Sequence, residues 1–238
     1  MPSNKKVWAI VPAAGIGKRM SSVVPKQYLM LRGKPILEHT LNRLWESPCI
    51  DGVVVGVRND DAHWETINTD HEKFLGISHG GKERIHTVLK AMDLLLARYD
   101  TARDDWVLVH DAVRPCVSKA DIEKLVGRAN ANGEGALLAA RVMDTLKRSD
   151  GDHRVEKTVE RECHWRALTP QVFPLGTLKE ALESAVEKGV TATDESAAME
   201  LFGAYPELVE SGGNNIKITL KSDLLLAEFL LENGEEIS

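Results

Sequence analysis

The sequence has few cysteines and no long apolar run, and both deficits exclude whole classes of protein. Its cysteines, Cys49, Cys116 and Cys163, lie far apart and form no Cys-x-x-Cys pair, so we expect neither a disulfide framework nor a zinc site. No segment approaches the roughly 20 apolar residues of a membrane span. The opening apolar run, residues 7–11, ends at Pro12 and is shorter than the apolar region of a secretory signal. These absences predict a cytoplasmic protein with no membrane partner.

The sequence also lacks an excess of positive charge. It has 36 acidic and 30 basic residues in 238, a net charge of −6. A general nucleic-acid surface needs a broad basic patch that neutralises phosphates, so we expect no nucleic-acid partner. A small anionic ligand needs only a few local cations, and it remains compatible with this composition.

Short β-branched runs alternate with longer helical patterns along the chain. Strands are predicted at residues 7–11, 52–57, 106–109 and 136–142, and helices at 35–45, 83–97, 120–131, 175–186 and 224–231. This alternation predicts an α/β fold, a Rossmann-like, mainly parallel sheet with helices on both faces. No linker or repeat interrupts the pattern, so we expect a single domain over residues 1–238.

Residues 144–165 break the alternation, because they are mostly polar. Val155 and Val159 follow a turn-like stretch centred on Gly151, in a strand-like pattern. This pattern predicts a β-hairpin that projects from the sheet as an arm. A solvated loop is the alternative interpretation.

The loop after the first predicted strand reads Pro-Ala-Ala-Gly-Ile-Gly-Lys-Arg-Met from residue 12, and Pro-Lys-Gln follows from residue 25. Ligands of open parallel sheets bind beyond the carboxyl ends of strands, where this loop must lie. Small residues allow backbone N–H groups to approach phosphate oxygens, and Lys18, Arg19 and Lys26 add positive charge. The loop therefore favours a phosphate-bearing ligand; glycines that only form a tight turn are the alternative.

Two common phosphate-binding motifs do not match this loop. The dinucleotide fingerprint requires a third glycine where Met20 stands, and no Gly-Lys pair is followed by Ser or Thr as in a Walker A loop. An NAD-dependent dehydrogenase is therefore disfavoured.

The loop instead resembles the nucleotide loop of nucleoside-diphosphate-sugar pyrophosphorylases. Within that superfamily, the chain is similar to the methylerythritol phosphate cytidylyltransferase family of the non-mevalonate isoprenoid pathway. The resemblance extends from Val7 to about Phe229 and rests on separate blocks, which include His-Asp-Ala-Val-Arg-Pro from residue 110, Asp-Thr-Leu-Lys from 144 and Asn-Ile-Lys-Ile-Thr from 215. It implies transfer of CMP from CTP to 2-C-methyl-D-erythritol 4-phosphate, with release of pyrophosphate.

The resemblance also implies which residues bind the nucleotide. Those of the first loop are Ala13, Ala14, Gly15 and Gly17, and those that recognise the cytosine are Gly81, Lys82 and Thr87. Relatives often have Asp where Lys82 stands, which leaves the role of that side chain open. An ordinary helix N-terminus is the alternative interpretation of the second group.

The implied catalytic residues are cations around the transferring phosphate: Arg19, Lys26 and Lys217. Asp111, at the end of a predicted strand, is placed to hold Mg²⁺ directly or through water, and Arg114 to grip a phosphate or hydroxyl. A buried structural Asp–Arg pair is the competing interpretation. We infer no second carboxylate ligand, because Asn214 stands where relatives often have Asp.

The resemblance further implies a homodimer in which the arm crosses a two-fold axis. Thr145 would touch the phosphorylated substrate, and Arg161 and Thr169 would reach the active site of the partner subunit. Thr193-Asp194-Glu195 matches another family block, but we interpret it chiefly as a helix start that Asp194 caps.

The implied reaction requires no general base. The attacking group is a phosphate monoester with a second pKa of about 6, so it is largely dianionic at neutral pH. Two alternatives share the nucleotide loop: a cytidylyltransferase for another polyol phosphate such as ribitol 5-phosphate, and a non-catalytic nucleotide-binding regulator.

Overall fold

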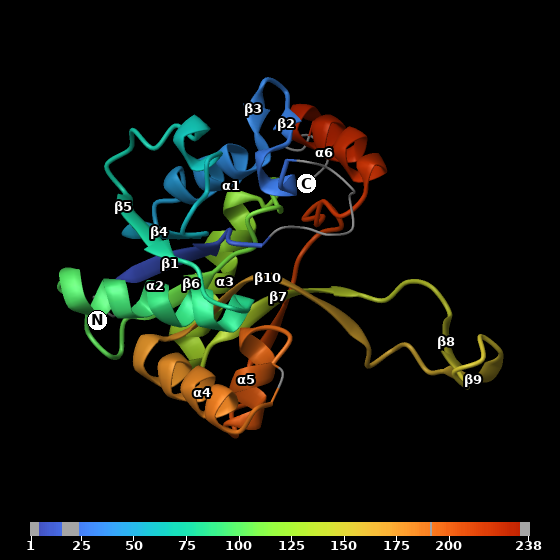
Figure 1. Cartoon of the computed structure of the whole chain (residues 1–238). Coiled ribbons are helices and arrows are strands. Elements are labelled where there is room, and N and C mark those ends of the chain that lie inside the picture. Colours follow the sequence, from blue (N-terminus) through green and yellow to red (C-terminus); the bar gives the residue numbers. More distant parts are fainter. Residues whose placement is uncertain (1–4, 16–23, 191, 234–238) are drawn as a thin grey trace.

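The computed structural model describes residues 5–15, 24–190 and 192–233 (Figure 1). A central seven-stranded sheet has the order β11-β7-β10-β6-β1-β4-β5. Its strands are β1 (Val7–Pro12), β4 (Gly52–Val57), β5 (Phe74–His79), β6 (Trp106–Val109), β7 (Ala136–Arg141), β10 (Trp165–Pro174) and β11 (Glu207–Glu210). Only β10 runs antiparallel to its neighbours, so the prediction of a mainly parallel sheet is confirmed.

The centre of the sheet consists of the apolar runs that the sequence marks as strands. In the ladder, Ile10 of β1 lies beside Val54 of β4 on one side and Val109 of β6 on the other. All three side chains are buried, because helices cover both faces of a central parallel strand. The predicted strands at 52–57 and 106–109 have the observed bounds.

The sequence interpretation missed three strands of the sheet, β5, β10 and β11. The strands β5 and β11 form the two edges, and their residues are only partly apolar. The strand β10 contains Pro170, and its pairing with β7 shifts register between Ala167 and Gln171. Polar residues and proline in such a segment conceal its strand character from pattern analysis.

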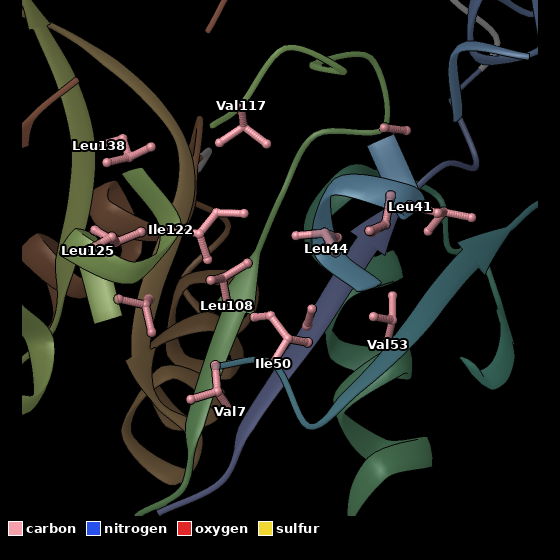
Figure 2. Packing of buried hydrophobic residues seen from close by; sticks show 14 of the residues in the cluster. Val7, Leu41, Leu44, Ile50, Val53, Leu108, Val117, Ile122, Leu125 and Leu138 are labelled. Carbon is pink, nitrogen blue, oxygen red and sulfur yellow. The ribbon is translucent and has the colours of Figure 1, made fainter. Parts of the chain in front are cut away.

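Helices cover both faces of the sheet, as predicted. They are α1 (Ile36–Trp45), α2 (Arg84–Arg98), α3 (Lys119–Asn132), α4 (Leu175–Glu187), α5 (Glu195–Leu201) and α6 (Lys221–Asn233). On one face, Leu44 of α1 and Ile122 of α3 pack against sheet residues such as Leu108 (Figure 2). The helices α2, α4 and α5 cover the other face, and α6 packs beside the small ribbon of β2 (Met30–Leu31) and β3 (Lys34–Pro35). No helix among the described residues is long and apolar enough to cross a membrane.

The predicted arm is a hairpin of β8 (Leu146–Ser149) and β9 (Val155–Val159). It lies at the end of a long extension of β7 and β10 and projects away from the sheet and helices (Figure 1). Most of its residues are exposed. The hairpin prediction is confirmed, and the alternative of an unstructured solvated loop is wrong.

Candidate active site

A first cleft opens at the carboxyl ends of the central strands. One wall is the segment after β1, with Ala13, Ala14 and Gly15. The opposite wall is the start of α2, with Gly81, Lys82 and Thr87. Lys26, Asp111 and Lys217 also line this cleft, so the structure brings together nine residues that the sequence analysis selected.

Small residues allow the two walls to approach each other closely. The Ala13 N–H donates to the Gly56 carbonyl at 2.7 Å, which fixes the segment after β1 to the end of β4. A Cβ atom at Gly80 would lie 2.4 Å from the Ala14 Cβ, which is closer than real side chains approach. A side chain at Gly80 would therefore push apart the walls of the first cleft.

The Thr87 hydroxyl stabilises the turn that precedes α2. It accepts from the Gly81 N–H at 3.1 Å and donates to the Glu83 carbonyl at 3.3 Å. Local hydrogen bonds of this kind match the alternative interpretation of an ordinary helix start. Thr87 also lines the first cleft, so the same residue shapes the wall on which Gly81 lies.

A second cleft adjoins the first and shares three residues with it. Residues found only in the second cleft include Arg114, Thr169, Gln171 and Asp194. The shared residues are Arg84, Asp111 and Lys217. A ligand in one cleft would therefore meet a ligand in the other at these three charged side chains.

Asp111 is the centre of this junction. Its carboxylate lies 2.8 Å from Lys217 Nζ, 3.4 Å from Arg114 Nε and 3.5 Å from Arg84 Nε. Burial alone would raise the pKa of Asp111, but Arg84 and Lys217 outweigh it and hold that pKa well below its ordinary range. Asp111 is therefore ionised, and the proposed Asp–Arg pair does exist in the structure.

Arg84 and Glu195 form a second ion pair at the junction, which the sequence analysis did not identify. Arg84 Nη1 and Nη2 donate to the two carboxylate oxygens of Glu195 at 2.5 and 3.0 Å, in a bidentate arrangement. Burial lowers the pKa of Arg84, but Glu195 and Asp111 outweigh it and raise the pKa above its ordinary value. The predicted cap is confirmed, since the Asp194 carboxylate accepts from the Ala197 N–H at the start of α5.

Thr169 is oriented by His110, which is fully buried. The His110 Nε2 lies 3.1 Å from the Arg114 carbonyl, which can only accept, so Nε2 carries the proton and Nδ1 accepts from the Thr169 hydroxyl. Burial lowers the pKa of His110 to about 4, which keeps the ring neutral. The Thr169 oxygen in turn accepts from the Asp111 N–H at 3.0 Å.

These bonds correct one expectation. Thr169 lies beside Asp111 of its own chain and is 5% exposed, so the expectation that it reaches a partner subunit is wrong. It lines the second cleft of its own chain because β10 passes directly beside β6 in the sheet.

The other predicted residues lie in three different places. Lys26 begins a short 3-10 helix, η2 (Lys26–Tyr28), and its Nζ lies 3.5 Å from the Ile218 carbonyl. Thr145 and Arg161 are exposed at the base of the arm and line neither cleft. Gly17 and Arg19 lie outside the described residues.

A single carboxylate, that of Asp111, is the feature of this site that fits a metal ion. Within the described ranges, no group of three or more His, Cys, Asp or Glu side chains could hold a metal ion alone. Mg²⁺ is commonly bound by one or two carboxylates together with substrate phosphates. The ionised Asp111 carboxylate, which lines both clefts, fits that second arrangement.

Comparisons with known proteins agree with this geometry. The family model for 2-C-methyl-D-erythritol 4-phosphate cytidylyltransferase matches residues 7–233. A protein of that name from Shewanella amazonensis is 46% identical to the chain, over 98% of this chain and 97% of the relative. One from Vibrio vulnificus is 44% identical, over 96% of this chain and 95% of the relative.

Solved structures give the same result. The crystal structure of a 4-diphosphocytidyl-2C-methyl-D-erythritol synthase superposes with a TM-score of 0.83 at 34% identity, over 96% of this chain and 99% of the other. The crystal structure of a Francisella tularensis 2-C-methyl-D-erythritol 4-phosphate cytidylyltransferase superposes with a TM-score of 0.80 at 35% identity. The match covers 94% of this chain and 99% of the other.

Proposed function

The chain belongs to the 2-C-methyl-D-erythritol 4-phosphate cytidylyltransferase family, and from this premise we propose how its two clefts divide the reaction. The protein is a nucleotidyltransferase of isoprenoid precursor biosynthesis. It transfers CMP from CTP to 2-C-methyl-D-erythritol 4-phosphate and releases pyrophosphate. We assign CTP to the first cleft and the phosphorylated acceptor to the second.

The observation that carries this assignment is the shared junction. The first cleft offers backbone groups and small residues, which suit a nucleotide whose phosphates approach the main chain closely. The second offers the guanidinium of Arg114 beside Arg84, which suits a phosphate monoester. Because both clefts end at Lys217 and Asp111, the acceptor phosphate can approach the innermost phosphorus of CTP from the opposite side to the leaving pyrophosphate.

The chain's own residues supply positioning and positive charge. The acceptor phosphate, dianionic at neutral pH, attacks the α-phosphorus of CTP, and the bond from that phosphorus to the pyrophosphate oxygen breaks. Lys26 and Lys217 line the first cleft and stabilise the negative charge on the five-coordinate phosphorus, with Arg19 as a third cation. His110 is neutral and buried, and it serves to orient Thr169 rather than to accept a proton from the substrate.

We propose Mg²⁺ as the cofactor, which Asp111 would hold directly or through water. When bound, Mg²⁺ neutralises charge on the triphosphate and favours the departure of pyrophosphate. Lys217 Nζ lies 2.8 Å from the Asp111 carboxylate, and its ammonium group has further donors that can bind a phosphate at the same junction.

We propose that the chain acts as a homodimer. Thr145 and Arg161 are exposed on the arm and line neither cleft of their own chain, yet both stand in blocks that match the family. An arm that projects from the body can bring these residues to the second cleft of a partner chain, where Arg161 would bind the acceptor phosphate (Figure 1).

Pyrophosphate release tests the assignment of substrates. The purified protein is incubated with Mg²⁺, each of the four ribonucleoside triphosphates and either 2-C-methyl-D-erythritol 4-phosphate or ribitol 5-phosphate. We expect rapid release only with CTP and 2-C-methyl-D-erythritol 4-phosphate. Faster release with ribitol 5-phosphate would favour the sister activity, and no release with any pair would favour a nucleotide-binding regulator.

A further inference from the structure

Gln27 is a buried polar residue next to Lys26, and the mechanism above gives it no task. It lies in η2 and is 3% exposed. Its Nε2 donates two hydrogen bonds, to the Ala13 carbonyl at 2.7 Å and to the Gly15 carbonyl at 3.0 Å. Both acceptors belong to the segment after β1 that forms one wall of the first cleft. A single amide group therefore binds two carbonyls of the phosphate loop.

The direction of these carbonyls matters for an anionic ligand. A carbonyl oxygen carries partial negative charge, and one that faced the cleft would repel a triphosphate. In a trans peptide the C=O and the next N–H point in opposite directions. By holding the Ala13 carbonyl, Gln27 therefore fixes the direction of the Ala14 N–H, on a residue that lines the cleft.

Other contacts make Gln27 a rigid support. The Ala13 N–H is held by the Gly56 carbonyl of β4, so the start of the loop is bound on both sides. On the far side of η2, the Tyr28 hydroxyl donates to the Asp61 carboxylate at 2.8 Å. The turn that carries Lys26 is thus tied to the phosphate loop through Gln27 and to the neighbouring loop through Tyr28.

We infer that Gln27 is a positioning residue for the triphosphate: its amide occupies the Ala13 and Gly15 carbonyls, so that they do not face the phosphates as free acceptors, and it sets the distance between this segment and Lys26. Gln27 also lines the first cleft, but both N–H donors of its amide are used by these two carbonyls, so we assign its effect to the position of the backbone. This inference rests on the proposed binding of CTP in the first cleft, and it deepens that proposal by naming what holds Ala13 and Gly15 in place before the ligand arrives.

Two substitutions separate this role from simple packing. Gln27→Met keeps nearly the same length and removes both donors. Gln27→Glu keeps the shape but places a carboxylate, which can only accept, against two carbonyl oxygens. Trp8→Phe is the control, because it removes another buried side-chain donor, the bond to Asp105 at 2.9 Å, near the start of β1 and away from both clefts.

The measurement is CTP affinity by titration calorimetry with Mg²⁺ and without acceptor, alongside urea unfolding of each variant. We expect Gln27→Met to bind CTP about tenfold more weakly. We expect Gln27→Glu to bind more weakly still at pH 8, and to recover relative to wild type as the pH falls to 6, because a buried carboxyl group protonates readily and regains one donor. Trp8→Phe should lose stability and keep its CTP affinity within about twofold.

A CTP affinity of Gln27→Met within about twofold of wild type would overturn the inference. So would a Trp8→Phe variant that loses CTP affinity as strongly as Gln27→Met does, since general destabilisation would then account for the effect. If Gln27→Glu does not fold, the titration of Gln27→Met decides alone. If the wild-type protein fails to bind CTP, the proposed nucleotide site in the first cleft is wrong. If the wild type binds CTP and Gln27→Met binds it equally well, only the inference about Gln27 is wrong.

Discussion

Asp111 in the body and Arg161 in the arm are both charged residues that the sequence assigns to an active site, yet their surroundings differ. Asp111 is 8% exposed and lies within 3.5 Å of cationic groups on Lys217, Arg114 and Arg84. Arg161 is exposed, and its side chain donates to the carbonyl of Met143, which directly precedes the arm. The body therefore neutralises the charge of Asp111 within one chain, whereas the arm presents an exposed cation that lines neither cleft of its own chain. This difference is what we expect if the arm completes the site of another chain.

The body side of this comparison is tested most strongly by Lys26→Ala. Removing one preorganised charge from the transition state commonly lowers turnover by about 10²–10³. We expect kcat to fall by that factor in steady-state pyrophosphate release, and KM for CTP to change much less. Lys119→Ala, which removes an exposed lysine at the start of α3, is the control and should retain full activity. An unchanged kcat in Lys26→Ala would show that the assignment of this lysine is wrong.

The arm side is tested by mixing two variants of lowered activity. Arg161→Ala should lose about 10–100-fold in kcat/KM for the acceptor, because it removes hydrogen bonds to a charged phosphate. When Lys26→Ala and Arg161→Ala chains are refolded together, each mixed dimer has one site with an intact body and an intact partner arm. We expect recovery to about one quarter of wild-type activity, as random pairing in a two-fold dimer requires. No recovery, or an active monomer in gel filtration, would place Arg161 outside the partner's site.

The two regions should also differ in their effect on stability. Asp111→Asn leaves three cations near the junction without their shared carboxylate, and breaking a buried ion pair in this way costs about 3 kcal/mol of unfolding free energy. Arg161→Ala should change that free energy by less than about 0.5 kcal/mol, since the residue is exposed. Urea unfolding at one fixed protein concentration measures both. Equal losses would mean that the arm contributes to the folded body.

The features that the sequence predicted correctly are those with a local signal. Continuous apolar runs mark β1, β4 and β6, and the loop after β1 follows from its small and basic residues. The strand β10 lacked that signal, because Thr169 and Gln171 face a cleft and Pro170 interrupts the strand pattern. A strand that carries polar site residues has fewer apolar residues, so its sequence pattern is harder to recognise as a strand.

Pairings between distant segments could not be predicted at all. Arg84 and Glu195 are 111 residues apart in sequence, and each stands in a block whose local pattern indicates only a helix start. Their contact depends on how α2 and α5 pack on the same face of the sheet. Likewise, the assignment of Thr169 to the partner subunit failed because only the sheet order shows that β10 runs beside β6.

The smallest effect that we expect compares two similar carboxylates, one in each region. Asp223 accepts from the Thr219 and Leu220 N–H groups at the start of α6, and Asp150 accepts from the Asp152 and Arg154 N–H groups in the arm turn. Asp223→Ala should lower the free energy of unfolding by about 1 kcal/mol, which is typical of a lost hydrogen bond at a helix start. The loss affects the body because α6 packs on it through Ala227. Asp150→Ala should leave the urea midpoint unchanged, because no residue of its turn belongs to a buried core cluster of the part of the chain that the structure describes.

The contribution of Asp223 to stability should also depend on pH. Partial burial raises the pKa of Asp223, but the N–H groups of Leu220 and Thr219 outweigh it and lower that pKa below its ordinary value. The unfolded chain then binds the proton more readily, so the stabilisation by Asp223 is present above a pH of about 4 and is lost as the pH falls further. The difference in unfolding free energy between wild type and Asp223→Ala should therefore shrink in acid. A difference that stayed constant with pH would mean that Asp223 stabilises α6 by packing, and the two carboxylates would then differ in their contacts and not in their charge.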